Sequence, residues 1–126
     1  MAVRAELRGS ALHVGLTGWD RAMAWQRSVE VDRAQVVQAS VERRGAVEPA
    51  VDHRVRGIGP HDGAGRPGRR RVGTMLGRAV PGPQFWAVPA SGPDLPVLVL
   101  DLSGHALARV VLSLDDPDAT AAALRT

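Results

Sequence analysis

The chain of 126 residues contains no cysteine, no lysine and no tyrosine, and only four aromatic residues. Without cysteine it can form neither disulfides nor thiolate metal sites. Its longest uncharged apolar run, near residues 96–100, is far shorter than the roughly 20 residues of a membrane-spanning helix. The N-terminus carries Arg4 and Glu6 where a signal peptide would be apolar. These absences predict a soluble, cytoplasmic protein.

Hydrophobic residues make up 44% of the chain, which is the composition of a folded domain rather than of a disordered segment. A length of 126 residues is ordinary for one domain, and we expect a single domain over residues 1–126. Because aromatic residues are scarce, valine, leucine and alanine must fill most of its core.

Alternation of apolar and polar residues predicts a mainly β protein with a minor helical part. Gly9 and Ser10 form a turn signal between the first two expected strands, and Asp32 starts a single turn before residue 36. The expected strands are 3–8, 11–16, 28–31, 36–43, 70–77, 84–89, 96–102 and 107–114.

Two short helices are expected. Thr17 and Asp20 are spaced nearly as a capping box, and apolar residues follow at helical spacing, so a helix is predicted over 18–26. Asp116 stands before Pro117, as an N-cap stands before a proline at the first helical position. A C-terminal helix of about ten residues should therefore start there and dock Leu124 on the rest of the protein, since so short a helix is marginal alone.

The segment at about 45–69 shows no period and is rich in glycine, proline, histidine and arginine, so we expect a long loop. Residues 43–78 contain nine arginines and three acidic residues, whereas the rest of the chain has seven arginines and ten acidic residues. The first explanation for this local excess of arginine is a solvated loop in an arginine-rich protein, and the second is a loop that binds an anion or a protein. The candidate anion-binding residues are Arg54, Arg56, Arg66, Arg69, Arg70, Arg71 and Arg78.

No catalytic, metal or cofactor motif stands out. Residues 63–68 match GxGxxG, but a proline lies inside the motif and no helix is expected after it, so a dinucleotide site is not predicted. The four histidines are too scattered to indicate a metal site. Asp115 and Asp116 are adjacent carboxylates, but helix capping accounts for Asp116. We therefore expect no enzyme activity, no metal and no cofactor.

Four stretches in order support a family resemblance: LTGWDRAMAW, SVEVDRAQVVQASV, the run from RGIG through GRPGRRRVGTMLGR to QFWAV, and VLSLDDPDATAAAL. Together they resemble small, mostly uncharacterised actinobacterial proteins with a bacterial pleckstrin-homology-like fold. The resemblance covers nearly the whole chain. It implies a partly open antiparallel barrel of about seven strands, with a short helix after the second strand and a C-terminal helix that caps the barrel.

The resemblance implies little about function, because such folds serve many roles. With no catalytic set in view, we expect a non-enzymatic interaction module that binds a protein or peptide partner. The alternative is a peripheral binder of anionic lipid or phosphate ligands through the basic 54–78 region. Nucleic acid ranks third, because no aromatic residue interleaves these arginines to stack on bases.

Overall fold

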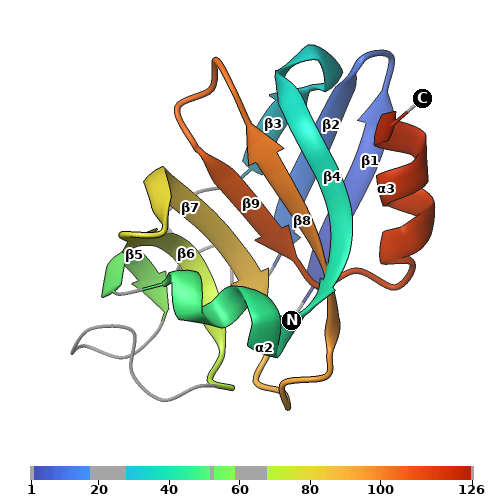
Figure 1. Ribbon diagram of the computed structural model, residues 1–126. Coiled ribbons are helices and arrows are strands. Elements are labelled where there is room, and N and C mark those ends of the chain that lie inside the picture. Colours follow the sequence, from blue (N-terminus) through green and yellow to red (C-terminus); the bar gives the residue numbers. More distant parts are fainter. Residues whose placement is uncertain (1, 18–27, 52, 59–67, 126) are drawn as a thin grey trace.

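The computed structural model describes residues 2–17, 28–51, 53–58 and 68–125. Two sheets lie against each other, and α3 covers the opening on one side (Figure 1). One sheet has three strands in the order β1-β2-β3, and the other has six in the order β4-β8-β9-β7-β6-β5. The elements are β1 (Ala2–Arg8), β2 (Ala11–Thr17), β3 (Ser28–Asp32), η1 (Arg33–Gln35), β4 (Val36–Arg43), α2 (Arg44–Val47), η2 (Glu48–Ala50), β5 (His53–Ile58), β6 (Arg71–Gly77), β7 (Val80–Val88), β8 (Pro96–Leu102), β9 (Arg109–Leu112) and α3 (Pro117–Arg125).

The expected mainly β class with a minor helical part is confirmed, and so is the expectation that the sheets do not close into one barrel. The described residues form nine strands rather than about seven. Pairing is antiparallel throughout except between β7 and β9, which run parallel with Phe85 beside Val110. The parallel pair arises because β8 lies beyond β9, so that β9 returns between β7 and β8.

The three-stranded sheet follows local sequence chemistry. Gly9, at a φ of +61°, and Ser10 form a two-residue turn between β1 and β2. Leu12 and Val14 of β2 face the core together with Val29 and Val31 of β3. The turn expected at Asp32 is confirmed as η1, where the Asp32 side chain accepts from the Ala34 N–H.

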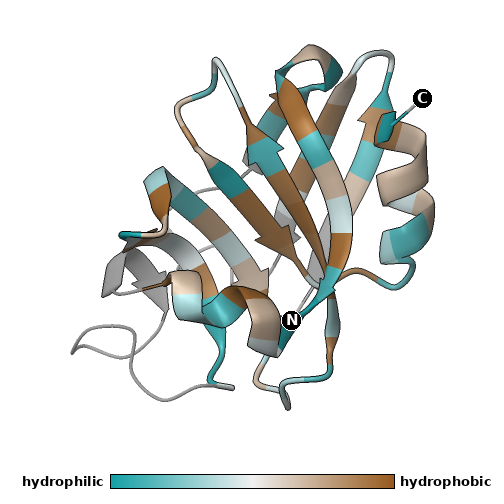
Figure 2. Ribbon diagram, viewed as in Figure 1, coloured by the Kyte–Doolittle hydropathy of each residue, from teal (hydrophilic) through white to brown (hydrophobic). Residues whose placement is uncertain are grey.

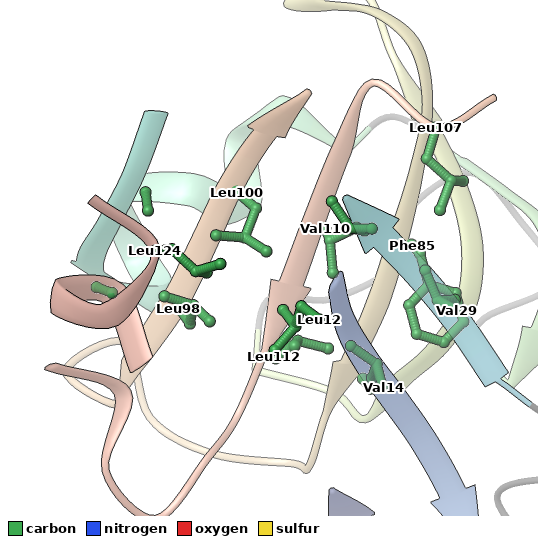
Figure 3. Packing of buried hydrophobic residues seen from close by; sticks show 14 of the residues in the cluster. Leu12, Val14, Val29, Phe85, Leu98, Leu100, Leu107, Val110, Leu112 and Leu124 are labelled. Atoms are coloured by element: carbon green, nitrogen blue, oxygen red, sulfur yellow. The ribbon is translucent and has the colours of Figure 1, made fainter. Parts of the chain in front are cut away.

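The centre of the six-stranded sheet is buried on both faces, so β7, β8 and β9 are apolar on both sides. On the inner face, Leu98 and Leu100 of β8 lie beside Leu124 of α3, and Val110 and Leu112 of β9 lie near Leu12 of β2 (Figure 3). Figure 2 shows hydrophobic residues concentrated on β8 and β9 in the middle of the sheet. The outer face carries a second cluster of Val47, Val51, Met75, Trp86, Val88, Val97, Val99 and Val111.

This burial corrects one sequence interpretation. The alternation of residues 107–114 predicts that Val111 shares a solvent-facing side of the strand with Arg109 and Ser113, but Val111 is fully buried in the outer cluster. The cover over that face is the chain from Arg44 to Val51, which contains α2 and η2. Alternation along a strand cannot reveal such a cover, because the covering residues lie far away in sequence.

The C-terminal helix is confirmed as predicted. The Asp116 carboxylate accepts from the Ala119 N–H at 3.1 Å, and Pro117 is the first helical residue. Ala121 and Leu124 are buried in the inner cluster, and α3 packs against β4 and β8. At its end, Arg125 Nε donates to the Ala39 carbonyl oxygen of β4 at 2.8 Å.

The expected loop at about 45–69 is wrong for its first part. Residues 44–50 form α2 and η2, and 53–58 form β5, which pairs with β6. α2 and η2, of four and three residues, are too short to show a helical period. Residues 59–67 and the expected helix at 18–26 lie outside the described residues. Within the described part of the chain, no helix has the length and apolar character needed to cross a membrane.

Leu124→Ala should lower the free energy of unfolding by about 2–5 kcal/mol, because it removes a buried anchor of α3 from the inner core. Urea unfolding measures the change. Val37→Ala is the matched control, since Val37 is exposed, and it should change stability by less than about 0.5 kcal/mol. Equal effects of the two substitutions would contradict the docking of α3.

Candidate functional site

Among the candidate arginines whose side chains are described, Arg71 is buried while Arg69 and Arg78 are exposed before and after β6, so these side chains do not form one exposed cluster. Arg54 and Arg56 belong to β5, Arg69 and Arg70 precede β6, and Arg78 follows β6 in an exposed turn. Arg66 lies outside the described residues. Arg69 is exposed and Arg70 is half-buried. The structure therefore distributes the basic residues along the β5–β6 hairpin and its two ends.

Arg71 differs from the other candidates because it is only 1% exposed. Its Nε donates to Glu48 Oε2 at 2.9 Å, and the two side chains form a buried ion pair. Arg71 is the first residue of β6, and it lies in the layer that η2 and α2 cover. A guanidinium held in this way faces the interior, so Arg71 joins the protein's own framework rather than a solvent-facing anion site.

Arg44, which the sequence did not single out, is the second guanidinium in this layer and is fully buried. Its Nε and Nη2 donate to Glu48 Oε2 at 3.1 and 2.9 Å. Nη1 donates to the Pro89 carbonyl oxygen and to Ser91 Oγ, and Nη2 also donates to the Arg69 carbonyl oxygen. Arg44 thus connects α2 to two distant turns of the chain.

Glu48 lies between the two arginines and accepts from both. Its Oε1 also accepts from the Gly68 N–H at 2.9 Å. Burial alone would raise the pKa of Glu48, but the hydrogen bonds from Arg71, Gly68 and Arg44 and the charge of Arg44 outweigh it, so the pKa is lowered. The carboxylate is therefore ionised in the folded protein at neutral pH, and it links residues 44–48 to the start of β6.

Two further contacts hold the same cover on the outer face. Gln84 Nε2 donates to the Ala50 carbonyl oxygen at 2.9 Å, and Trp86 Nε1 donates to Gln84 Oε1 at 3.1 Å. Gly77 lets η2 approach β6 closely, since a Cβ there would lie 1.7 Å from the Ala50 oxygen.

We name Arg44, Glu48 and Arg71 the buried ion network. The spacing of Arg44 and Glu48, one helical turn, was the one sequence signal for it.

The edge strand β4 presents a solvent-facing surface. Of the described strands only β8 pairs with it. A bulge between Val36 and Gln38 interrupts the register, and Val37, the bulged residue, is 70% exposed. The alternation of residues 36–43 predicts that Val37 lies on the buried side with Ala39 and Val41, and the bulge is the reason that this prediction is wrong for Val37. Among the described residues, Val37 is the exposed large hydrophobic side chain.

Two grooves flank α3. One, of about 410 Å³, lies between β4 and the end of the helix and is lined by Val36, Val37, Gln38, Ala39, Ser40, Leu124 and Arg125. The other, of about 420 Å³, lies between β1 and the start of the helix and is lined by Ala5, Glu6, Leu114, Asp115, Asp116, Ala119 and Thr120. Asp116 caps α3 in that second groove, so its carboxylate already has a structural role.

The two histidines whose side chains are described both lie beside Glu30, with His13 Nδ1 3.8 Å from Glu30 Oε2. His105 Nδ1 accepts from the Leu107 N–H at 2.9 Å, and its Nε2 lies 2.7 Å from the Glu30 carbonyl oxygen, which fixes the β8–β9 turn against β3. His53 belongs to β5, and His61 lies outside the described residues. Within the described part of the chain, no three side chains of His, Cys, Asp or Glu group closely enough to hold a metal ion.

Comparison of the chain with models of protein families, with curated proteins and with solved structures found no match in any of the three. The resemblance to pleckstrin-homology-like proteins therefore stays a prediction. What the protein does has to be argued from its own surfaces.

Glu48→Gln should lower the free energy of unfolding at neutral pH by about 3–5 kcal/mol, because two buried guanidiniums would then share a neutral amide. Urea unfolding measures this loss. Glu42→Gln, at an exposed position of β4, is the control and should change stability by less than about 0.5 kcal/mol. A loss of less than about 1 kcal/mol for Glu48→Gln would mean that the network contributes little.

The ionisation of Glu48 makes part of the free energy of unfolding depend on pH in the acid range. Folding lowers the pKa of Glu48 from 4.5. The stabilisation of the folded state by the Glu48 carboxylate is therefore complete above pH 4.5, and it is lost as the pH falls through the lower pKa of the folded protein. The difference in unfolding free energy between wild type and Glu48→Gln should therefore narrow as the pH falls below 4.5. A difference that stays constant over this range would contradict the ionised state of Glu48.

Proposed function

We propose that this protein is a non-enzymatic, cytoplasmic interaction module that binds an extended segment of a protein partner as an added strand along β4. Strand addition uses the unpaired backbone groups of a sheet edge for affinity and neighbouring pockets for side-chain selectivity. β4 has eight residues, and its one partner among the described strands is β8, so no described strand pairs with its other edge, which α3 covers in part.

The contact of Arg125 with Ala39 carries this proposal. Because Arg125 Nε donates to the Ala39 carbonyl oxygen, that oxygen points away from β8 and toward the open edge. Backbone groups alternate along a strand, so those of Val41 face the same way. A donor from outside the sheet already reaches this edge, and the N–H groups of an extended peptide would meet the same row of acceptors.

The side chains beside this edge suit a peptide. Val37 offers an apolar contact to a neighbouring strand, and an exposed valine on an open edge is what most proteins avoid. The groove between β4 and α3 begins beside Val37 and ends at Leu124 and Arg125. It could receive one side chain of the added strand while the backbone pairs with β4.

Peptides selected from a random library on the wild-type protein test the proposal. Val37→Asp should lower the affinity for a selected peptide by at least about tenfold, because it removes the apolar contact and adds a charge beside the new strand. Ala79→Asp, which adds the same charge in the exposed turn before β7, should leave affinity unchanged. Amide exchange of Ala39 and Val41 should slow when the peptide binds, as expected of newly paired N–H groups.

The proposal fails if the library yields no binding peptide. It also fails if the selected peptides bind Val37→Asp as tightly as wild type and leave exchange at Ala39 and Val41 unchanged. Thermal melting is the control for folding, and both variants should melt as the wild type does because both positions are exposed.

A further inference from the structure

The guanidinium of Arg125 is held beside the edge of β4 that no described strand pairs with. Arg125 is the last residue of α3, and its Nε donates to the Ala39 carbonyl oxygen at 2.8 Å. The preceding residue, Leu124, is only 5% exposed and anchors this end of the helix in the inner cluster. An arginine on a surface normally samples many rotamers, whereas this one is restricted at its backbone and at its Nε. Its charge therefore stays at the strand edge in the free protein.

The contact through Nε leaves the two terminal nitrogens of Arg125 for a ligand. Arg125 is exposed, and in the described part of the chain Ala39 is the one hydrogen-bond partner of its side chain. The N–H groups of Nη1 and Nη2 form a planar fork that matches the two oxygens of a carboxylate. A ligand that lies along β4 would meet this fork at the end of the groove.

The positive charge of Arg125 stands alone in the groove between β4 and α3. None of the other residues that line this groove is charged. The charged residues of β4 itself are Glu42 and Arg43, which are neighbours of opposite sign at its far end. Arg43 also lies 3.7 Å from the Asp94 carboxylate. The groove is therefore neutral along the strand and positive where it meets the end of α3.

We propose that Arg125 makes β4 selective for added strands that carry a glutamate or an aspartate at one defined position. This inference rests on the function proposed for β4 and names the class of segment that the strand binds. A backbone carbonyl oxygen has two lone pairs, so the Ala39 oxygen can accept from Arg125 and from the added strand together. The carboxylate of the ligand accepts from Nη1 and Nη2 in a charge-assisted contact.

Strand geometry fixes the spacing of the acidic residue in the ligand. Directly opposite residues of two paired strands point to the same face of a sheet, and along one strand this face recurs every second residue. Ala39 points to the inner face, where its side chain is buried in the inner cluster beside α3. Of the ligand residues on this face, one enters the groove beside Leu124 and the next reaches Arg125. We therefore expect an aliphatic and an acidic residue two positions apart.

The random peptide library, selected in parallel on wild type and variants, tests this pattern. The wild-type pool should be enriched in glutamate or aspartate two positions from an aliphatic residue. Arg125→Gln should remove the acidic preference, and Arg125→Glu should replace it by a preference for lysine or arginine, while the aliphatic residue is kept. Arg69→Gln removes an exposed arginine before β6, toward the other end of the sheet, and should leave the acidic preference unchanged.

A second measurement uses one selected peptide and the same peptide with glutamine in place of its acidic residue. The glutamine peptide should bind wild type at least about fivefold more weakly. The two peptides should bind Arg125→Gln within about twofold of each other, because the carboxylate has then lost its partner. The comparison on wild type stands by itself if the Arg125 variants melt at a lower temperature.

Each outcome decides between the proposals. A library that yields no peptide refutes both the function proposed for β4 and this inference. Peptides that lose affinity for Val37→Asp but show no acidic preference refute this inference alone. An acidic preference that persists in Arg125→Glu, or that is lost equally in Arg69→Gln, also refutes it, because the carboxylate then lies elsewhere. A chain that sediments as a dimer, and as a monomer after Val37→Asp, would assign the edge to a second copy of the protein.

Discussion

The cover on the outer face of the large sheet depends on one carboxylate. Glu48 accepts hydrogen bonds from Arg44, at the start of α2, and from Arg71 and the Gly68 N–H, which belong to the segment that leads into β6. Removing two arginines from water is costly, and the carboxylate compensates only because its hydrogen-bond geometry is good. Without it, the buried guanidiniums of Arg44 and Arg71 would lose their shared acceptor, and the segment from Arg44 to Val51 would be held by its other hydrogen bonds, those of Arg44 to Pro89, Ser91 and Arg69 and that of Gln84 to Ala50.

That cover explains the valine-rich composition of the sheet. Trp86 and Val111 need shielding on the outer face while Phe85 and Val110 need it on the inner face, so neighbouring residues of β7 and β9 are buried alternately on each side. β-branched residues pack well on such a pleated surface. The scarcity of aromatic residues therefore does not prevent a full core, because the chain obtains two layers of small apolar contacts rather than one layer of large ones.

The sequence predicted what local chemistry determines. The Gly9–Ser10 turn, the cap at Asp32, the strand Val36–Arg43 and the Asp116–Pro117 helix start all follow from residues within a few positions of each other. It could not predict the β7–β9 pairing or the burial of Arg71, because both depend on distant partners. A run of arginines looks alike whether its members face water or a glutamate 23 residues earlier in the chain.

The two edge strands of the six-stranded sheet, β4 and β5, differ in the residues that lie beside them. At β4, Arg125 and the bulge at Val37 modify an edge that α3 partly covers, so an added strand would meet apolar contact and a helix beside it. At β5, the one described partner is β6, and the exposed Arg69 and Arg78 lie before and after β6 at the two ends of that hairpin. Charged residues near a sheet edge oppose pairing between copies of a protein, whereas β4 is modified by a bulge and a helix, so the two edges differ in the chemistry that they present.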